Sequence, residues 1–377
     1  MTTWDCIGWG LVAATVWTML PIWFAFRAPR RIGDVPPADP KDPDLPFVSI
    51  IVPARQEGAS VEAALTTLLS LDYPRYEVIA IDDRSTDATG EIMERISASD
   101  PRCRVLHVTE LPQGWLGKNH ANWLGARLAR GDLLLFTDGD VHLDPPVLGH
   151  AAAAMRQLEL DHLVLFPKIP PGGFGESVAM CHFSFLFCAF TKFSMAQYRW
   201  LPGAFVGVGA FNLVTRAAYQ AIGTHERLRL EVADDLMLGK LVKRAGFRQR
   251  ALLGMPMVRV KWQQGLMGVV RGLEKNAFAA VHYSVVLAVG GVLLHPLSMI
   301  APIVLAVTGP AQLQFAIIVA LTWASYVVST LANPFPLGVA FCYPLASLLF
   351  AYIFARSTFV TMQNGGVTWR DTFCPLS

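Results

Sequence analysis

The sequence predicts an α/β domain with a mainly parallel sheet, together with α-helical transmembrane segments. The first observation behind this fold class is composition. Of the 377 residues 53% are hydrophobic, and the mean hydropathy is +0.40, which is too apolar for an ordinary soluble protein. The second is that nearly all charged residues lie between two apolar regions, where strand-like and helix-like segments alternate. We therefore expect a water-soluble domain held between membrane segments.

Residues 6–26 form the first apolar region, an uncharged run long enough to cross a bilayer core that requires about 20 helical residues. Only Asp5 is charged before this run, whereas three arginines follow it by position 31. By the positive-inside rule, this asymmetry predicts an outside N-terminus and a cytoplasmic chain after the run. A cleaved signal peptide is the alternative, but its basic n-region and small-residue cleavage site are missing. We therefore expect residues 1–31 to be a transmembrane anchor.

Residues 32–46, rich in Pro and Asp, are expected to be a linker, and the soluble domain is expected over residues 47–276. Buried strands are predicted from short apolar runs, and helices from apolar residues at helical spacing. The predicted strands are 48–54, 76–82, 103–108 and 133–137, and the predicted helices are 60–70, 86–96 and 119–129. Such alternation argues for a parallel sheet covered by helices on both faces, in which ligands bind beyond the carboxyl ends of the strands.

Two carboxylates, Asp138 and Asp140, directly follow the strand predicted at 133–137. Because residues i and i+2 of an extended segment point the same way, both enter one crevice and repel unless a hard cation lies between them. Mg²⁺ typically uses one or two carboxylates plus substrate phosphates, so the pair favours a nucleotide-diphosphate site. The alternative is an Asp-rich turn that ends the strand and caps the next helix.

Other polar residues follow the earlier strands: Arg55 and Glu57 the first, Asp82 and Asp83 the second. The first turn has no glycine pattern of the GxGxxG or GxxxxGK type, which weakens a dinucleotide oxidoreductase or a P-loop NTPase. Phosphates would instead be held by a metal and a basic group. Lys118 is the obvious cation, although a single loop lysine is usually just solvated.

Asp234 and Asp235 are adjacent acids before a helix predicted over 236–245. Like-charge repulsion should raise the pKa of one of them, as a general base requires. The alternative is that they only cap the helix and occupy its first turn.

Residues 180–200 are rich in aromatic side chains and poor in charge. They form either a buried core helix or an interfacial segment that lies on the bilayer and opens the acceptor site toward a lipid. The following segment, 206–212, is expected to be a tight strand of small residues where a substrate could approach the backbone.

Residues 277–356 are expected to be a C-terminal transmembrane region, followed by a tail over 357–377. Prolines divide the region into apolar runs of roughly 278–307, 312–332 and 337–355. Three spans would place Arg356 and Arg370 outside, against the positive-inside rule. Either the first run re-enters or doubles back, or the rule fails here.

The six cysteines show no CxxC pair and no histidine spacing suited to zinc. Disulfide and zinc interpretations are therefore poor, and a reduced cytoplasmic compartment fits. The net charge of +2 gives no reason to expect a nucleic-acid partner.

Five motifs occur in a fixed order. They are Pro53-Ala54-Arg55-Gln56-Glu57, Ile81-Asp82-Asp83-Arg84-Ser85-Thr86-Asp87, Gly114-Trp115-Leu116-Gly117-Lys118, Thr137-Asp138-Gly139-Asp140 and Ala233-Asp234-Asp235. In order and spacing they resemble the family 2 glycosyltransferases, whose GT-A fold is a Rossmann-like nucleotide-diphospho-sugar transferase domain, over roughly residues 46–276. The membrane frame, with one anchor before the domain and several after it, is similar to the branch that glycosylates lipids, such as hopanoid-associated, carotenoid and ceramide glycosyltransferases.

The resemblance implies a role for each matching residue. The nucleotide sugar would be bound by Pro53, Arg55, Glu57, Asp82, Asp83, Lys118 and Asp138. Within this set, Glu57 and the Asp82–Asp83 pair would contact the uracil and ribose, and Lys118 would lie near the phosphates. Asp138 and Asp140 would hold Mg²⁺ or Mn²⁺ on the diphosphate.

The resemblance also implies the catalytic base. Asp235 matches the last acid of the family's Glu-Asp pair, which is proposed there as the general base. Asp234 replaces the glutamate of that pair in this chain. Which of the two carboxylates acts therefore stays open, and both are candidates.

Trp262, Arg271 and Lys275 are predicted to contact the acceptor, because they lie between the acid pair and the first C-terminal apolar run. Processive polysaccharide synthases carry Gln-x-x-Arg-Trp in this region. Here the sequence is Val258-Arg259-Val260-Lys261-Trp262, a departure that argues against chain polymerisation. Arg271 and Lys275 share a helix face at i and i+4, where they could bind lipid phosphate or the donor; a simple positive anchor beside the membrane is the alternative.

Together these observations predict an integral protein of a bacterial-type cell membrane, with its catalytic domain in the cytoplasm. It is expected to transfer one sugar, with inversion, from a nucleotide sugar (a UDP-sugar is expected) to a lipid or lipid-linked hydroxyl. Its expected partners are the donor, the lipid acceptor and the membrane. The alternatives are a processive polysaccharide synthase and a non-catalytic membrane scaffold, and the intact acids speak against the scaffold.

Overall fold

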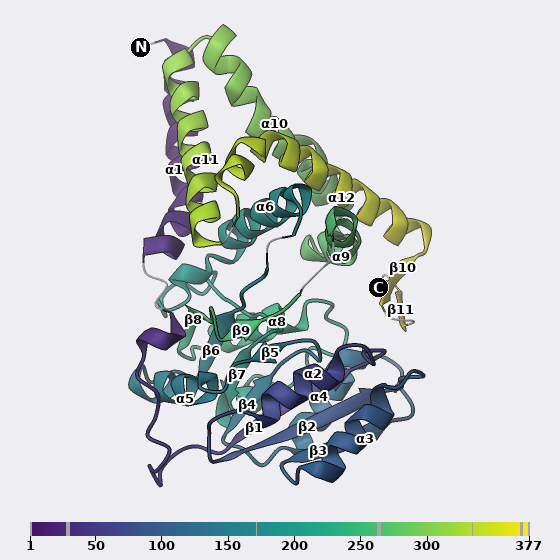
Figure 1. Ribbon diagram of the computed structural model, residues 1–377. Helices are drawn as coiled ribbons and strands as arrows, with labels where there is room; N and C mark the ends of the chain where they lie inside the picture. The colour runs from purple at the N-terminus through teal and green to yellow at the C-terminus, as the bar shows by residue number, and fades with distance from the viewer. Residues whose placement is uncertain are drawn as a thin grey trace. The chain divides into compact units, whose positions relative to one another are not determined.

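The structure is a computed structural model that describes residues 2–27, 31–170, 172–261, 265–333, 335–369 and 372–375 (Figure 1). Contacts divide the chain into two compact units. Unit 1 comprises Met1–Ala28, Pro171–Lys192 and Trp262–Ser377, and unit 2 comprises Pro29–Pro170 and Phe193–Lys261. The domain boundaries given by the sequence stay a prediction.

Unit 2 contains a seven-stranded sheet with the order β3-β2-β1-β4-β7-β6-β8. Its strands are β1 (Val48–Ala54), β2 (Tyr76–Asp83), β3 (Cys103–Val108), β4 (Leu133–Phe136), β6 (His162–Phe166), β7 (Asn212–Thr215) and β8 (Gln249–Leu253). Strands β3, β2, β1 and β4 pair in parallel, as do β6 and β8, whereas β7 pairs antiparallel with both of its neighbours. The predicted mainly parallel α/β sheet is confirmed.

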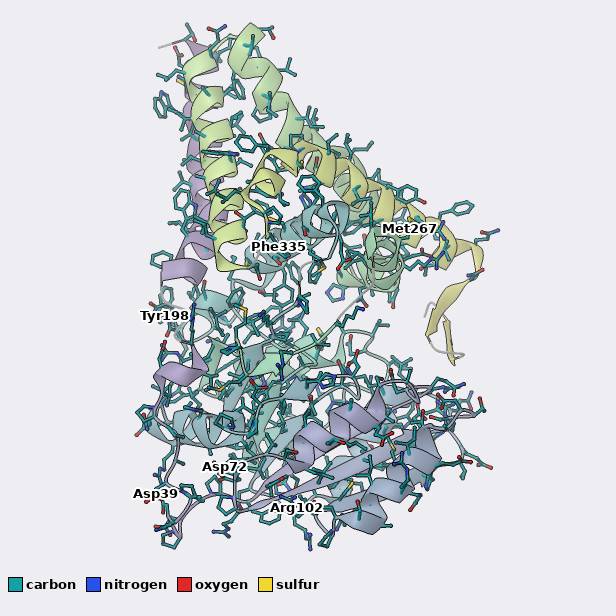
Figure 2. All side chains as sticks on the ribbon, in the orientation of Figure 1. Asp39, Asp72, Arg102, Tyr198, Met267 and Phe335 are labelled. Carbon is teal, nitrogen blue, oxygen red and sulfur yellow. The ribbon has the colours of Figure 1, made fainter. Side chains whose placement is uncertain are left out.

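Helices surround this sheet. They are α2 (Val61–Leu69), α3 (Thr89–Ser99), α4 (Gly117–Leu128), α5 (Val147–Gln157), α7 (Arg216–Ala221) and α8 (Asp234–Arg244), and a small second sheet pairs β5 (His142–Leu143) with β9 (Val258–Arg259). The strands are buried because they carry runs of β-branched and other apolar residues, and all seven residues of β1 are buried. At the end of α3, Arg102 donates to Tyr76 Oη and to the Leu69 carbonyl, which fixes the loop before β3 (Figure 2).

Glycine brings α4 close to the sheet. A Cβ at Gly125 would lie only 2.6 Å from Ile51 Cγ2 and 2.9 Å from Ile81 Cδ1, so a larger residue would push the helix away from β1 and β2. These isoleucines belong to a core that also includes Leu238 of α8. The same core therefore positions the first turns of both α4 and α8, which carry the candidate site.

Unit 1 is built from long apolar helices. They are α1 (Thr3–Arg27), α6 (Phe174–Thr191), α9 (Gly265–Ala280), α10 (Val285–Thr308), α11 (Gln312–Ala332) and α12 (Tyr343–Gln363), followed by the strands β10 (Gly366–Trp369) and β11 (Thr372–Pro375). Among the described residues five segments are long and apolar enough to cross a membrane: most of α1, α6, α10, most of α11, and Leu337–Gln363. Apolar side chains extend outward along α10 and α12 (Figure 2), as expected for helices surrounded by lipid.

The apolar run expected over 278–307 is divided between two helices. The chain leaves α9 at Ala280 and enters α10 at Val285, and it turns through His282 and Tyr283, whose φ angles of 51° and 56° are left-handed. Residues 180–200 do not form one element either, because α6 ends at Thr191 and a short 3-10 helix follows.

A buried polar cluster joins three helices of unit 1. Nε2 of His182 in α6 shares a hydrogen bond of 2.9 Å with Nε2 of His295 in α10. Nδ1 of the same histidine lies 2.6 Å from Tyr326 Oη of α11. His182 is fully buried. Because unpartnered polar groups are costly among apolar helices, these bonds fix the packing of the three helices on one another.

Candidate active site

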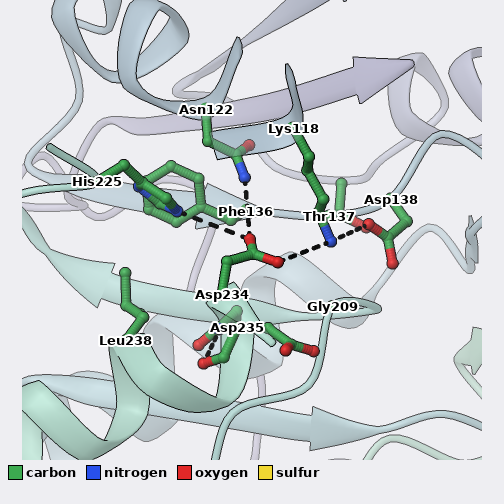
Figure 3. Close-up of a pocket in the computed structure, with 11 residues that line it drawn as sticks. Lys118, Asn122, Phe136, Thr137, Asp138, Gly209, His225, Asp234, Asp235 and Leu238 are labelled. Atoms are coloured by element: carbon green, nitrogen blue, oxygen red, sulfur yellow. Dashed lines mark hydrogen bonds and ion pairs between the residues drawn. The ribbon is translucent and has the colours of Figure 1, made fainter. Parts of the chain in front are cut away.

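A pocket in unit 2 brings together polar residues from distant parts of the sequence (Figure 3). It lies where β4 ends and where α4 and α8 begin. Its lining consists of Lys118, Asn122, Phe136, Thr137, Asp138, Gly209, Asn212, His225, Asp234, Asp235 and Leu238. The position beyond a carboxyl strand end is where ligands bind to parallel sheets.

Asp138 is held at this strand end by its backbone and by the residue before it. Its N–H donates to the Gly209 carbonyl over 3.1 Å, and Thr137 Oγ1 donates to the Ala210 carbonyl over 2.8 Å. Its neighbour Gly139 lies against the end of β1, since a Cβ there would be 3.0 Å from Ala54 Cβ. The acidic turn therefore stays beside the residues that follow β1.

Lys118 joins Asp138 to the acid pair. Its Nζ lies 2.7 Å from Asp138 Oδ1 and 3.5 Å from Asp234 Oδ1, and Figure 3 shows the ammonium between the two carboxylates. Lys118 lies in the first turn of α4, which begins at Gly117. The predicted helix began two residues later and left this lysine in a loop. The prediction of a loop position for Lys118 is therefore wrong. Its place in the first turn of the helix explains why the side chain has a fixed direction.

Asp234 is the most enclosed of the three acids that line the pocket, with 5% of its surface exposed. Besides Lys118, Asn122 Nδ2 donates to Asp234 Oδ2 over 3.4 Å, and His225 Nε2 lies 3.9 Å from the same oxygen. Asn122 follows Lys118 by four residues, so both project from one face of α4. Both oxygens of Asp234 are therefore directed at groups of the protein.

Asp235 is half-buried, and its carboxylate contacts fewer groups of the protein than that of Asp234 does. Its Oδ1 accepts a hydrogen bond from the Leu236 N–H over 2.7 Å. The two acids lie in the first turn of α8, as the helix-cap alternative predicted, but the N-cap residue is Ala233 and neither acid takes that position. This does not separate the two interpretations, because an acid at a helix N-terminus can cap the helix and still face a substrate.

The segment expected as a strand over 206–212 is a loop that enters β7 only at Asn212. The strand prediction is wrong because this segment packs against the carboxylate of Asp138 and the backbone of Asp235. A Cβ at Gly209 would lie 2.5 Å from Asp138 Oδ2, and a Cβ at Gly207 would overlap the Asp235 carbonyl oxygen. Glycine is required at both positions by close approach of another group.

Burial and mutual repulsion set the protonation of the site. Burial, reinforced by Asp235 and Asp138 and opposed by Lys118, raises the pKa of Asp234 to about 6. Burial also raises the pKa of Asp235. The charge of Lys118 opposes this shift, and the charge of Asp138 adds to it. Burial alone would lower the pKa of Lys118, but the three carboxylates outweigh it and raise it, so the ammonium stays charged.

Residues at the carboxyl ends of β1 and β2 form the other part of the predicted site. Glu57 N–H donates to Thr89 Oγ1 over 2.9 Å, and Ser60 Oγ donates to Glu57 Oε2 over 2.9 Å. Asp82 accepts from the Ser85 N–H over 3.1 Å and lies 3.0 Å from His107 Nδ1. These contacts hold both carboxylates at the carboxyl edge of the sheet.

Asp83 forms two hydrogen bonds with Arg84, of 2.8 and 3.1 Å. A Cβ at Gly117 would overlap Asp83 Oδ2, so this acid lies against the residue that precedes Lys118. Pro53 pairs with Ile81 in the register of β1 and β2, and Arg55 directly follows β1. The nucleotide-binding roles of these residues stay predictions.

The donor set of the acidic turn suits a hard cation. Burial, reinforced by Asp138 and Glu57, raises the pKa of Asp140 to about 6, so these carboxylates sense one another's charge. Carboxylate oxygens are the ligands that Mg²⁺ and Mn²⁺ prefer. Among the described residues no group of three or more His, Cys, Asp or Glu forms a complete metal site. Asp138 and Asp140 therefore fit as a partial ligand set that substrate phosphates would complete.

The predicted acceptor residues belong to unit 1 or lie outside the described residues. Arg271 is exposed on α9. Lys275 is on the same helix, but its side chain is outside the described part of the chain, and Trp262 is outside it altogether. Their acceptor role stays a prediction.

Three polar pocket residues were not predicted from the sequence: Asn122, Asn212 and His225. Asn122 could have been found from its i+4 spacing to Lys118 on a helix. His225 and Asn212 carry no comparable pattern. His225 is 1% exposed, and burial together with Lys118 lowers its pKa to about 3, so it is neutral at Asp234.

Comparisons with known proteins agree with this geometry. Residues 49–223 match the family model for glycosyl transferase family 2. The 4,4'-diaponeurosporenoate glycosyltransferase of Staphylococcus haemolyticus is 26% identical over 247 residues, which cover 61% of this chain and 60% of that protein. The beta-monoglucosyldiacylglycerol synthase of Nostoc sp. is 34% identical over 115 residues, which cover 30% of this chain and 24% of that protein.

Among solved structures, a mannosyltransferase of Pyrobaculum calidifontis, determined with GDP-Man and Mn²⁺, superposes with a TM-score of 0.57. The alignment covers 96% of this chain and 99% of that one at 19% sequence identity, a likeness that shows the fold alone. The GT-A fold is thereby confirmed, and so is the resemblance to lipid-glycosylating relatives. The resemblance to glycosyl transferase family 2 is likewise confirmed over residues 49–223, and this match supports a glycosyltransferase.

Proposed function

We propose that the protein is an inverting glycosyltransferase that moves one sugar from a nucleotide-sugar donor to a lipid or lipid-linked hydroxyl. We further propose a UDP-sugar as donor and the cytoplasmic face of the cell membrane as the place of reaction. The observation that carries the proposal is the contact of Lys118 with Asp138 and Asp234, because it joins the acid that follows β4 to the acid pair in one pocket. The enzyme class agrees with the family of the domain.

The donor would lie along the carboxyl edge of the sheet. Glu57, Asp82 and Asp83 would receive the nucleoside, since Glu57 follows β1 and the two aspartates end β2. Asp138 and Asp140 would hold Mg²⁺ or Mn²⁺, which when bound neutralises charge on the leaving diphosphate. Lys118 supplies a permanent positive charge beside the same phosphates, and its two carboxylate partners hold it in place.

Asp235 is the proposed general base. A base must reach the acceptor hydroxyl, and Asp235 is the more accessible of the two acids, whereas the oxygens of Asp234 already face Lys118, Asn122 and His225. Burial raises the pKa of Asp235, which makes its carboxylate a stronger proton acceptor. Asp234 then acts as a positioning residue for Lys118.

A single displacement accounts for inversion. The acceptor oxygen loses its proton to Asp235, forms the bond to the anomeric carbon, and the bond from that carbon to the diphosphate oxygen breaks. Attack from the face opposite the leaving group inverts the anomeric carbon. The pocket contributes by holding the two reactants in line.

A membrane acceptor is supported by the helices of unit 1 and by the relatives. In the described part of the chain five segments are long and apolar enough to cross a membrane, and two relatives are named as a 4,4'-diaponeurosporenoate glycosyltransferase and a beta-monoglucosyldiacylglycerol synthase. The arginines that follow the first apolar run support a cytoplasmic soluble domain.

The test is transfer from a panel of labelled nucleotide sugars by membranes that contain the full chain, followed by lipid extraction. One discrete labelled lipid is expected, and membranes with Asp235→Asn serve as the control. Products that lengthen with time would indicate a polysaccharide synthase. Absence of any labelled product with every donor, while the protein is folded, would indicate a non-catalytic scaffold.

A further inference from the structure

Three buried polar side chains form a chain of hydrogen bonds beneath the candidate site. Gln249 of β8, His162 of β6 and Asn212 of β7 are each 2% exposed or less. Gln249 Nε2 lies 2.6 Å from His162 Nδ1, His162 Nε2 bonds to Asn212 Oδ1, and Asn212 Nδ2 donates to the Asp235 carbonyl over 3.2 Å. The chain therefore ends on the backbone of the proposed base.

The direction of these bonds is fixed from one end. The Val206 N–H donates to Gln249 Oε1 over 3.0 Å, so the Gln249 amide must present its NH₂ group to His162. His162 Nδ1 then accepts, and its Nε2 carries the hydrogen that Asn212 Oδ1 accepts. Asn212 is left with its NH₂ group toward Asp235. Burial lowers the pKa of His162 to about 4, which keeps this neutral tautomer at physiological pH.

The chain holds α8 at a second point. Gln249 Nε2 also donates to the Gly239 carbonyl over 2.9 Å, one helical turn after Asp235. Between these points the helix packs backbone against backbone on the loop before β7. A Cβ at Gly239 would overlap the Val206 carbonyl, and a Cβ at Gly207 would overlap the Asp235 carbonyl. The first turn of α8 therefore cannot shift toward the sheet, and the hydrogen bonds oppose a shift away from it.

We propose that Gln249, His162 and Asn212 are positioning residues that set the location of Asp235 for proton transfer. The inference rests on the proposed function, in which Asp235 is the base. Gln249 and His162 do not line the pocket, and Asn212, which does, bonds to the Asp235 carbonyl, so the effect of the three residues is expected on the chemical step. A displacement of about 1 Å at a reacting group can cost about 10²-fold in rate.

The test compares Asn212→Leu with wild type in the full-length protein in detergent. Leucine has a similar size but forms none of the hydrogen bonds. With the donor found in the panel above, kcat should fall about 10- to 100-fold while the donor KM changes less than about threefold. The control is Ser49→Ala, which removes an equally buried polar group that bonds to Glu77 near the amino end of β1. This variant should keep wild-type kcat even if its melting temperature falls.

A second readout does not depend on transfer. Hydrogen exchange of peptides that cover residues 234–241 should accelerate in Asn212→Leu and not in Ser49→Ala, while exchange over α3 stays unchanged. If Asn212→Leu does not fold, Gln249→Met replaces it, with the same expected results. An unchanged kcat, or an equal loss in both variants, overturns the proposal. A protein that transfers no sugar refutes the proposed function, and the exchange result then decides separately whether the chain positions α8.

Discussion

Replacement of the two acids one at a time separates chemistry from positioning. Asp235→Asn keeps the size of the side chain and an oxygen that can accept the hydrogen bond from Leu236, so the fold of α8 should survive. The amide cannot accept a proton. Loss of a positioned general base costs about 10² to 10⁴ in kcat, which corresponds to about 3 to 5 kcal/mol in the barrier. Donor affinity should hardly change.

Asp234→Asn should behave differently. It removes one of the two carboxylates that hold Lys118, whose Nζ is 2.7 Å from Asp138 and 3.5 Å from Asp234. Because the shorter contact remains, Lys118 should stay charged and near Asp138. We therefore expect a fall in kcat of no more than about tenfold, together with a rise in donor KM, since a charge-assisted hydrogen bond contributes about 1.5 to 3 kcal/mol.

The assay is initial-rate transfer to extracted lipid, at saturating and limiting donor, with nucleotide binding measured separately by calorimetry. If Asp234→Asn proves the less active variant while its donor binding is intact, the base is Asp234 and the assignment is one residue too late. If neither variant slows transfer more than a few-fold, the pair serves only as a helix cap, and the reasoning is refuted.

The remaining predictions concern metal, pH and topology. EDTA should abolish transfer and Mg²⁺ or Mn²⁺ should restore it, and Asp140→Ala should lose metal-dependent nucleotide binding; full activity in EDTA would contradict this role. Burial raises the pKa of Asp234 and of Asp140 to about 6 and also raises that of Asp235. Because these groups must be charged, kcat should fall as pH decreases below about 6. A rate that is flat from pH 5 to 8 would exclude this dependence. In a Cys6→Ser background, a cysteine placed by Pro40→Cys should react with an impermeant reagent only after cells are broken, and labelling of intact cells would reverse the orientation.

The parallel half of the sheet could be predicted because each of its strands is a short apolar run bounded by turn residues, and helices alternate with the first three of them. The first strand, predicted over 48–54, has those bounds in the structure. The other half could not, since β7 has only four residues and pairs antiparallel with β4 and β6. Its position depends on long-range contacts of the glycine loop before it, which local pattern does not reveal.

The acids of the pocket could be picked out from the sequence because they occur in pairs, and Lys118 because it is the basic residue of a short motif. Asp138 and Asp234 belong to recognisable motifs, and the structure brings them to one lysine. His225 and Asn212 are single polar residues whose importance arises from burial next to those acids. The same is true of His182 in unit 1, because a histidine within an apolar stretch shows its partners only after the helices pack.

The most direct test of the central claim is the time course of label transfer from a nucleotide sugar into extracted lipid, with wild type, Asp235→Asn and Ser49→Ala measured side by side. We expect wild type and Ser49→Ala to produce one lipid species of constant size whose anomeric configuration is opposite to that of the donor. Asp235→Asn should produce the same species at least about 10² times more slowly. A product with retained configuration, or an Asp235→Asn variant as active as wild type, would contradict single displacement with this carboxylate as base.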